Sequence, residues 1–464
     1  MSDKNALIQP DRGQQAISIH LVEKDGLEKF TKGLTVPQRA LLEAARFTAS
    51  AGDHVILPEG EGWCAVAGVA DAATLSPWCL AKLAEKLPAG TYRRVDPNPG
   101  AEPGAAMLGW ILGQYAFDRY KADAEDQGPR VLLTGEPARI DAVTAEAEAV
   151  MLVRDLVNTP AEDMGPAQLE AEAEALHKAF RAVIRVTRGD ALERDFPMVH
   201  AVGRAAGRSH APRLIELEWG DPKHPRVAIV GKGVCFDSGG LDIKPSSGML
   251  LMKKDMGGAA HALALARLVM SANLPVRLHV LVPAVENAIS GNSFRPGDVL
   301  RSRAGITVEI GNTDAEGRLI LGDALTRAGE EKPDFIVDFA TLTGAARVAV
   351  GPDLPALFTR EDATADALLA AGKAVDDPCW RLPLHEGYRE YLKSDVADIN
   401  NAGTGGFAGA STAALFLDRF VPAGVDWAHF DTFAWRPAAK PGRPKGGEAL
   451  GLRAAWHMLK QRYG

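Results

Sequence analysis

Charged side chains that could bind metal ions gather in a glycine-rich segment directly after an apolar stretch, residues 227–230. This segment carries the candidate residues Lys232, Asp237, Lys244 and Asp255. Carboxylates bind divalent cations, and the lysines beside them balance part of their charge. Loops at the carboxyl ends of strands are also where α/β sheets hold their ligands. The segment is therefore a candidate metal-binding loop.

A second charged segment follows another predicted strand, residues 307–310, and reads Asp314-Ala-Glu316-Gly-Arg318. Side chains two residues apart share one face of an extended backbone. Asp314 and Glu316 are therefore predicted to point at one centre, with Arg318 next on the same face.

Together the two segments would bring four carboxylates beside two or three cations. Two divalent metal ions would neutralise such a cluster, because bridging carboxylates hold two ions about 3.5–4 Å apart in hydrolytic sites. Oxygen ligands suit Mn²⁺ or Mg²⁺, and Zn²⁺ also accepts carboxylates. We therefore expect a two-metal site.

The carboxylates also have purely structural interpretations. Asp255 stands just before Gly257, Gly258 and a predicted helix, where an aspartate commonly caps the helix N-terminus. Asp237 and Asp242 would equally suit turns, because their side chains accept backbone hydrogen bonds. Taken one residue at a time, these alternatives stay open.

The cations have similar alternatives. Lys232 and Lys244 would ordinarily be solvated surface lysines. Arg318, near a helix start predicted at Leu319, would ordinarily lie on the surface or pair with Glu316. The repetition of acids and cations in two loops after strands favours the metal site.

Other catalytic signatures are absent from the sequence. It has no phosphate-binding Gly-x-x-x-x-Gly-Lys motif, no dinucleotide fingerprint and no Gly-x-Ser-x-Gly elbow. His385-Glu386 lacks the second histidine of a thermolysin-type zinc site, and the 11 histidines and 4 cysteines show no ligand spacing. A metal site in this chain would therefore depend on carboxylates.

Strand and helix patterns alternate around these loops. Apolar stretches at 214–217, 227–230, 276–282 and 335–339 predict buried strands, and 259–270 predicts a helix. Upstream, strands are expected at 54–57 and 131–134, helices at 78–87, 107–120 and 140–157, and a surface loop at 96–104. The fold class is α/β, with a smaller N-terminal α/β domain (1–137), a linking helix and loop (138–165) and a larger α/β domain (166–464). The larger domain should hold a central mixed sheet flanked by helices.

Composition limits the classes of protein that remain. With 46% hydrophobic and 24% charged residues, the chain is of the globular type rather than collagen-like or disordered. Its net charge of -8 argues against nucleic acid as the main partner. The polar N-terminus lacks a signal pattern, no apolar run reaches membrane-spanning length, and the few scattered cysteines indicate a reducing compartment. We expect a cytoplasmic protein without a membrane partner.

Three segments resemble the leucyl (cytosol) aminopeptidase family: residues 232–240, residues 253–260 and, above all, the octapeptide Asn312-Thr-Asp-Ala-Glu-Gly-Arg-Leu319. The octapeptide is the signature of that family. Further similarity lies at residues 155–160, 338–344, 397–401 and 427–432. The resemblance covers at least residues 154–435, with a weaker trace at 114–120.

The resemblance implies a hydrolase, a metal-dependent aminopeptidase that releases N-terminal amino acids, preferably Leu-like ones, by a two-metal mechanism. The implied metal ligands are Lys232, Asp237, Asp255, Asp314 and Glu316. Asp237 and Glu316 would bridge the ions, and Lys232 would bind as a neutral amine, which requires a strongly lowered pKa. Here the resemblance overrides the surface interpretation of Lys232.

The resemblance also implies the catalytic groups. Lys244 would polarise the scissile carbonyl, and Arg318 would anchor a bicarbonate that acts as general base. The backbone of Leu342, Thr343 and Gly344 would flank the bicarbonate and the substrate. A peptide with a free N-terminus would bind its amino group to one metal, and the enzyme would be a hexamer of two trimers.

Two departures from the family pattern concern substrate preference. Lys253-Lys254 stands where many members have an arginine and a small residue, and residues 446–453 also differ. The alternative function is a non-catalytic protein on the same scaffold, such as a DNA-binding protein. The intact metal and catalytic positions and the acidic net charge argue against it.

Overall fold

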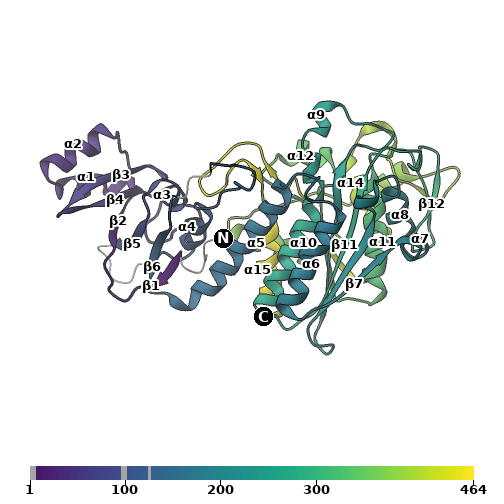
Figure 1. The fold of residues 1–464 in the computed structure, drawn as a ribbon, viewed down its shortest axis with the longest axis horizontal. Coiled ribbons are helices and arrows are strands. Elements are labelled where there is room, and N and C mark those ends of the chain that lie inside the picture. The colour runs from purple at the N-terminus through teal and green to yellow at the C-terminus, as the bar shows by residue number, and fades with distance from the viewer. Residues whose placement is uncertain (1–6, 96–101, 124–126) are drawn as a thin grey trace. The chain divides into compact units, whose positions relative to one another are not determined.

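The computed structural model describes residues 7–95, 102–123 and 127–464. The chain divides into two compact units (Figure 1). Unit 1 comprises residues 1–151 and 438–445, and unit 2 comprises residues 152–437 and 446–464. The domain boundaries predicted from the sequence, at residues 137 and 166, remain a prediction.

Unit 1 is built on a six-stranded sheet in the order β1-β6-β5-β2-β4-β3. Its strands are β1 Ile8–Pro10, β2 Ile17–Val22, β3 His54–Glu59, β4 Gly62–Gly68, β5 Gly90–Val95 and β6 Arg130–Thr134. Neighbouring strands are parallel except β3, which is antiparallel to β4. The β3–β4 connection is a two-residue turn in which Gly60 has φ 56°, a left-handed conformation that glycine adopts without strain.

Helices and a satellite segment complete unit 1. The helices are α1 Leu27–Lys32, α2 Val36–Ala44, α3 Ala81–Lys86 and α4 Ala106–Leu112. A capping box starts α2, in which Thr35 accepts from the backbone of Gln38 and the Gln38 side chain accepts from the Thr35 N–H. Residues 438–445 join this unit, and Gly442 donates to Glu85 in α3.

Unit 2 contains a nine-stranded mixed sheet in the order β16-β15-β18-β14-β9-β11-β8-β7, with β10 paired to β11. Its strands are β7 Val183–Arg188, β8 Arg213–Trp219, β9 Arg226–Gly231, β10 Gly233–Asp237, β11 Arg277–Asn287, β14 Phe335–Ala340, β15 Ala356–Thr359, β16 Trp380–Arg381 and β18 Asp426–Asp431. The central strands β11, β9, β14 and β18 are parallel. Both faces of β9 and β14 are buried, which explains their continuously apolar sequences.

Helices cover both faces of this sheet (Figure 1). The layer that contains α10 includes α6, α13 and α15, and the layer that contains α11 includes α7, α8 and α14. Their bounds are α6 Pro166–Phe180, α7 Gly189–Asp195, α8 Pro197–Gly203, α10 Gly257–Ser271, α11 Glu316–Glu330, α13 Asp362–Ala374, α14 Gly409–Asp418 and α15 Leu452–Tyr463. Helix α5, Ile140–Asn158, begins in unit 1 and ends in unit 2.

Shorter elements lie in the connections of unit 2. They are the helices α9 Ser246–Met249 and α12 Gly344–Val350, the three-stranded sheet β12 Val299–Arg301, β13 Thr307–Glu309 and β17 Ile399–Asn400, and the hairpin β19 Trp435–Arg436 with β20 Gly446–Gly447. The parallel pairing of β13 with β17 brings Asn400 beside Glu309.

The structure confirms the α/β class and the central mixed sheet flanked by helices. The predicted strands and the helix at 140–157 are present within a few residues. The helix predicted at 107–120 is wrong in length, because the chain leaves the helix at Gly113. The helix predicted at 78–87 is shorter, covering Ala81–Lys86. Most of the loop predicted at 96–104 lies outside the described residues.

Candidate metal centre

The candidate residues meet at the carboxyl edge of the central parallel strands. Lys232 directly follows β9, and Asp237 is the last residue of β10. Thr341 directly follows β14, which pairs with β9. Adjacent parallel strands end at one edge of a sheet, so residues distant in sequence are brought together there.

A glycine turn redirects the chain after Asp237. Gly239 and Gly240 have φ 88° and 63°, and a Cβ on Gly240 would lie 3.0 Å from both Asn287 Oδ1 and Thr313. The turn is closed by the Lys244 N–H, which donates to the Ser238 carbonyl. It thereby returns the Lys244 side chain to Asp237.

Asp255 belongs to a short 3-10 helix, η5 Met252–Met256, and is buried. The residue at the N-cap of α10 is Met256, so the capping interpretation of Asp255 is wrong. Asp255 Oδ1 instead accepts a hydrogen bond of 2.7 Å from the Thr341 hydroxyl. This bond orients the carboxylate toward Lys232.

The second segment differs from the predicted extended backbone. Helix α11 begins at Glu316, and Ala315 has φ -113° and ψ 41°, so Asp314 and Glu316 do not share the face of a strand. Arg318 lies inside the first turn of α11 and is buried, so the surface interpretation and the helix start at Leu319 are wrong. Gly317 permits the close approach of Lys232, because a Cβ there would lie 2.5 Å from Lys232 Cε.

Six of the candidate side chains form two groups of ion pairs, one around Lys232 and one around Lys244. Lys232 Nζ lies 2.7 Å from Asp255 Oδ2 and 3.0 Å from Glu316 Oε1. Lys244 Nζ lies 2.8 Å from Asp237 Oδ2 and also contacts Asp314. Lys232 is 2% exposed, so its surface interpretation is wrong. Four carboxylates thus face two ammonium groups, and two negative charges are left over when all are ionised.

The surplus of negative charge raises the pKa of two carboxylates. Burial, and then the charge of Asp237, raise the pKa of Glu316 to about 8 and that of Asp314 to about 6. Burial opposes the charge of Lys232, but Asp255 and Glu316 outweigh it and raise the Lys232 pKa. The isolated cluster therefore tends to take up protons, and a divalent cation would replace them.

The donor set fits metal ions. Carboxylate oxygens of Asp237, Asp255 and Glu316 lie within 4.8 Å of one another, and all three residues are buried. Glu316 Oε2 is buried and has no hydrogen-bond partner in the described part of the chain. An unpaired buried carboxylate oxygen is costly, and a cation would satisfy it.

Arg318 lies beside this cluster, and its guanidinium is only partly hydrogen-bonded within the described residues. Its Nη1 donates 2.7 Å to the Asn401 carbonyl, whereas its buried Nε has no partner among the described residues. Burial lowers the pKa of Arg318 to about 10, so it remains cationic at neutral pH. An unpaired buried N–H of a cation is suited to an anion.

The segment of Leu342, Thr343 and Gly344 connects β14 to α12. The N–H groups of Leu342 and Thr343 donate to Asp431 Oδ1, at 2.9 and 3.2 Å. These two N–H groups are therefore already used. Any contact of the segment with a small anion or substrate would have to come from Gly344 or from the carbonyls.

Four supporting residues were given no role by the sequence analysis. Asn287 donates to Asp237 Oδ1 at 2.9 Å, and Thr341 donates to Asp255. Asn401 accepts from the N–H groups of residues 311 and 312, and Asp431 holds the loop after β14. Thr341, Asn401 and Asp431 fall within segments that carried the resemblance. Asn287 could have been noticed as a polar residue at the end of an apolar strand.

Positive charge gathers beside Asp255 around the ring of Phe433. Lys254 is buried, and its Nζ lies 5.0 Å from the Phe433 ring centroid. Arg347, in α12, lies 5.0 Å from the same centroid. Lys254 is one of the departures from the family pattern found in the sequence.

Comparisons with known proteins agree with the fold and identify the family. A profile described as "Cytosol aminopeptidase family, catalytic domain" matches residues 151–455, and one described as "M17 aminopeptidase, N-terminal domain" matches residues 17–133. The crystal structure of a cytosol aminopeptidase from Coxiella burnetii is 47% identical, with a TM-score of 0.92, covering 99% of this chain and 100% of that one. The bottromycin maturation enzyme BotP in complex with Mn is 33% identical, with a TM-score of 0.86, covering 97% and 100%. A probable cytosol aminopeptidase of Leifsonia xyli subsp. xyli is 39% identical over 93% of this chain and 92% of its own length.

A mixed α/β sheet with buried carboxylates and a lysine at its carboxyl edge, in a chain with these relatives, defines the class of metal-dependent peptidases. More specifically, the chain belongs to the cytosol aminopeptidase (M17) family and is an aminopeptidase, a hydrolase. The resemblance seen in the sequence is thereby confirmed.

Two other expectations from the sequence concern membranes and DNA. No helix among the described residues is long and apolar enough to cross a membrane. The alternative of a non-catalytic DNA-binding protein is not favoured, because the relatives and structural neighbours are aminopeptidases.

Proposed function

We propose that the chain is a two-metal aminopeptidase in which Lys232, Asp237, Asp255, Asp314 and Glu316 hold the ions. One observation carries this proposal: oxygens of three buried carboxylates lie within 4.8 Å of one another, and Glu316 Oε2 has no hydrogen-bond partner among the described residues. Asp237 and Glu316 are the proposed bridging ligands. When bound, the ions would supply Lewis-acid activation of the scissile carbonyl and of a water molecule. Mn²⁺, Zn²⁺ and Mg²⁺ are the candidate ions.

Lys232 has to change its protonation to act as a ligand. In the metal-free cluster its ammonium pairs with Asp255 and Glu316 and donates to the Thr341 carbonyl. A cation held by the same carboxylates would remove the charges that keep this proton in place, and burial would then favour the neutral amine. Lys232 would lose one proton to solvent and bind through its lone pair.

Lys244 and Arg318 are the proposed catalytic residues. Lys244 lies in the same ion-pair network as Asp237 and Asp314, so its ammonium is held at the metal cluster. There it would stabilise negative charge that develops on the carbonyl oxygen of the substrate. Arg318 would hold bicarbonate through its unpaired Nε, and the bound anion would accept a proton from the attacking water. The loop of Leu342, Thr343 and Gly344 would flank the anion and the substrate.

The proposed substrates are peptides with a free N-terminus and a Leu-like first residue. The amino group would bind at the metal cluster, which restricts cleavage to the first residue. The cations near Phe433 make this preference worth testing directly. The informative panel is therefore Leu, Met, Asp, Glu and Lys amides, and faster turnover of the acidic amides would overturn the Leu-like preference.

The test of the metal mechanism combines metal analysis with turnover of a Leu-amide chromogen. We expect two ions per chain, loss of turnover on chelation, and recovery when Mn²⁺ or Zn²⁺ is returned. One ion per chain at full activity would contradict the two-metal proposal. Failure of metal-replete protein to turn over any aminoacyl amide would contradict the function as a whole.

We also propose a homohexamer of two trimers in the cytoplasm. Large apolar side chains are exposed in unit 2, including Leu250, Val348 and Phe407 at 78%, 82% and 77%, and such surfaces favour burial in an assembly. Sedimentation that shows single chains at working concentration would contradict the hexamer. Cell fractionation tests the compartment.

A further inference from the structure

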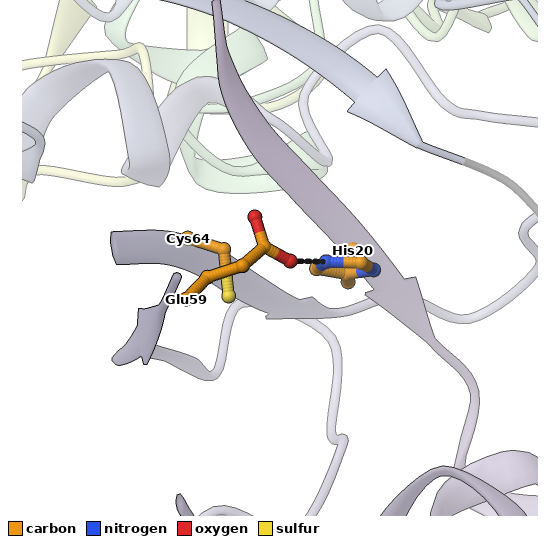
Figure 2. Close-up of side chains that lie close together, drawn as sticks. All are labelled: His20, Glu59 and Cys64. Carbon is orange, nitrogen blue, oxygen red and sulfur yellow. Dashed lines mark hydrogen bonds and ion pairs between the residues drawn. The ribbon is translucent and has the colours of Figure 1, made fainter. Parts of the chain in front are cut away.

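Unit 1 brings together three side chains that can bind a metal ion. They lie outside the proposed catalytic cluster, by which we mean the group of Lys232, Asp237, Lys244, Asp255, Asp314 and Glu316. His20 Nε2 lies 3.1 Å from Glu59 Oε1. One ligand atom from each of His20, Glu59 and Cys64 lies within 4.8 Å of the other two. Figure 2 shows the Glu59 carboxylate directed at the His20 ring, with the Cys64 sulfur close to both side chains.

Strand pairing explains why these residues meet. In the antiparallel pair β3–β4, Leu57 lies opposite Cys64 and Glu59 lies opposite Gly62. In the parallel pair β2–β4, His20 lies opposite Val66. Since side chains alternate between faces along a strand, Cys64 and His20 point to the same face of the sheet as Glu59.

The three donor side chains also differ in their exposure to solvent. The side chains of His20 and Glu59 are 27% and 44% exposed, whereas Cys64 is 3% exposed. Cys64 belongs to the apolar cluster that includes Leu57 and Val66. An ion could therefore approach from solvent beside His20 and Glu59 and be bound by Cys64 on the side of the core. The three ligands lie on the paired strands β2, β3 and β4.

We propose that His20, Glu59 and Cys64 form a second metal site, which binds a divalent ion of the zinc type. Imidazole, carboxylate and thiolate are the usual protein ligands of Zn²⁺, and a thiolate disfavours Mg²⁺ and Mn²⁺. Three protein ligands leave a fourth tetrahedral position for water or another small ligand. The site is distinct from the catalytic cluster, which offers oxygen and amine donors.

The charges around Cys64 favour a cation. Burial, and then the Glu59 carboxylate, raise the pKa of the Cys64 thiol to about 11, so the thiol is protonated when no ion is present. A divalent ion would oppose both effects, since it favours the thiolate and neutralises Glu59. Binding would form one metal–sulfur bond and release the thiol proton to solvent.

Cobalt is the probe that separates the two sites in the full-length protein. A thiolate bound to Co²⁺ gives a charge-transfer absorption in the near ultraviolet, which oxygen and amine ligands do not give. We expect Co²⁺ added to metal-free protein to produce this band, which should stop growing after three equivalents per chain: two for the proposed catalytic cluster and one for this site. Aminopeptidase turnover measured on the same samples reports the catalytic cluster separately.

Single substitutions assign the band to the proposed site. Cys64→Ser should abolish it, and His20→Ala and Glu59→Gln should each weaken Co²⁺ binding at this site at least tenfold. His20 is partly exposed, so His20→Ala keeps the test valid should the Cys64 variant fold poorly. Cys235→Ser is the matched control, because Cys235 lies two residues before Asp237 in the catalytic unit and should leave the band intact.

The outcomes are distinct from those of the aminopeptidase proposal. Absence of the band in cobalt-loaded wild-type protein, or its persistence in Cys64→Ser, would overturn the second site. Loss of the band in Cys235→Ser but not in Cys64→Ser would also overturn it. A band without any turnover would instead contradict the proposed function and leave the second site standing.

Discussion

The two groups of metal-suited side chains, one in each unit, are built in opposite ways. The catalytic cluster is mostly buried, consists of charged groups, and holds four carboxylates against two lysines, so two negative charges are not neutralised when all are ionised. The trio of His20, Glu59 and Cys64 lies on the face of a sheet, has two partly exposed members, and contains a single carboxylate beside a thiol that is protonated when no ion is present.

Because of this difference, we expect the cluster in unit 2 to need metal ions for a favourable arrangement, whereas the trio in unit 1 can bind an ion but does not need one. Buried charges are costly without partners, so the metal-free catalytic cluster is unfavourable and a cation relieves it. The trio can persist without metal as an exposed ion pair beside a buried thiol, which costs little. Removing metal should therefore affect unit 2 far more than unit 1.

The same substitution in both sites gives the largest expected contrast. Glu316→Gln removes a proposed bridging ligand and should lower kcat/KM for a Leu-amide at least about 10³-fold, whereas Glu59→Gln should have a far smaller effect on turnover. Parallel kinetics with metal analysis checks this. Comparable losses in the two variants would show that the units are not functionally separate.

Arg318 tests whether the catalytic cluster also holds an anion. Arg318→Met should lower kcat about 10²–10³-fold, because the group that orients the general base is lost, with little change in KM. Turnover of the wild-type enzyme should rise with added bicarbonate, and turnover of the variant should not. A variant that keeps the bicarbonate dependence would refute the assignment of Arg318.

Acid should destabilise unit 2 through the buried residue His261. His261 is buried, donates from Nδ1 to the Gly257 carbonyl and accepts at Nε2 from the Leu450 N–H, and burial lowers its pKa to about 4. Because neutral His261 in the folded chain binds fewer protons than in the unfolded chain, its contribution to stability should fall by about 3 kcal/mol as pH drops from about 6.5 to 4.

Denaturant unfolding at several pH values measures this loss in metal-free protein. His261→Gln, which keeps a donor and an acceptor without a titrating group, should flatten the dependence in that window. An unchanged pH profile in His261→Gln would contradict the buried neutral state of His261.

The smallest expected effect concerns a supporting residue of the catalytic cluster. Thr341→Val removes the hydroxyl that orients Asp255 while keeping the side-chain shape, and should weaken metal affinity about 10–100-fold, with activity regained at high metal. Thr326→Val, in α11, is the matched control, because it removes a hydroxyl whose one hydrogen bond within the described part of the chain goes to the Gly322 carbonyl. Equal metal affinities of the two variants would show that Asp255 needs no such support.

Much of unit 2 could be predicted from the sequence. Continuous apolar runs such as 227–230 and 335–339 indicated buried parallel strands, because both of their faces lie against helices. The positions of the charged loops followed from these strands. The local backbone around Glu316 could not be predicted in the same way, since the alternation of charges fits an extended strand and the first turn of a helix equally well.

The burial of individual charged residues also could not be predicted from the sequence. Lys232 and Arg318 have the residue types of a surface, and only the convergence of β9, β14 and α11 places them inside. The hydroxyl and amide groups that hold the cluster, from Thr341, Asn287 and Asn401, reach it from distant segments.

By itself, the sequence determined the α/β class and the family and indicated the loops in which the charged residues gather, because these depend on local patterns and on short contiguous motifs. Tertiary structure alone decided which charges are buried and which donors meet. His20, Glu59 and Cys64 show this most clearly, since no motif joins them and the scattered cysteines gave no sign of a ligand set. Strand register, a long-range property, brings the three to one face of the sheet.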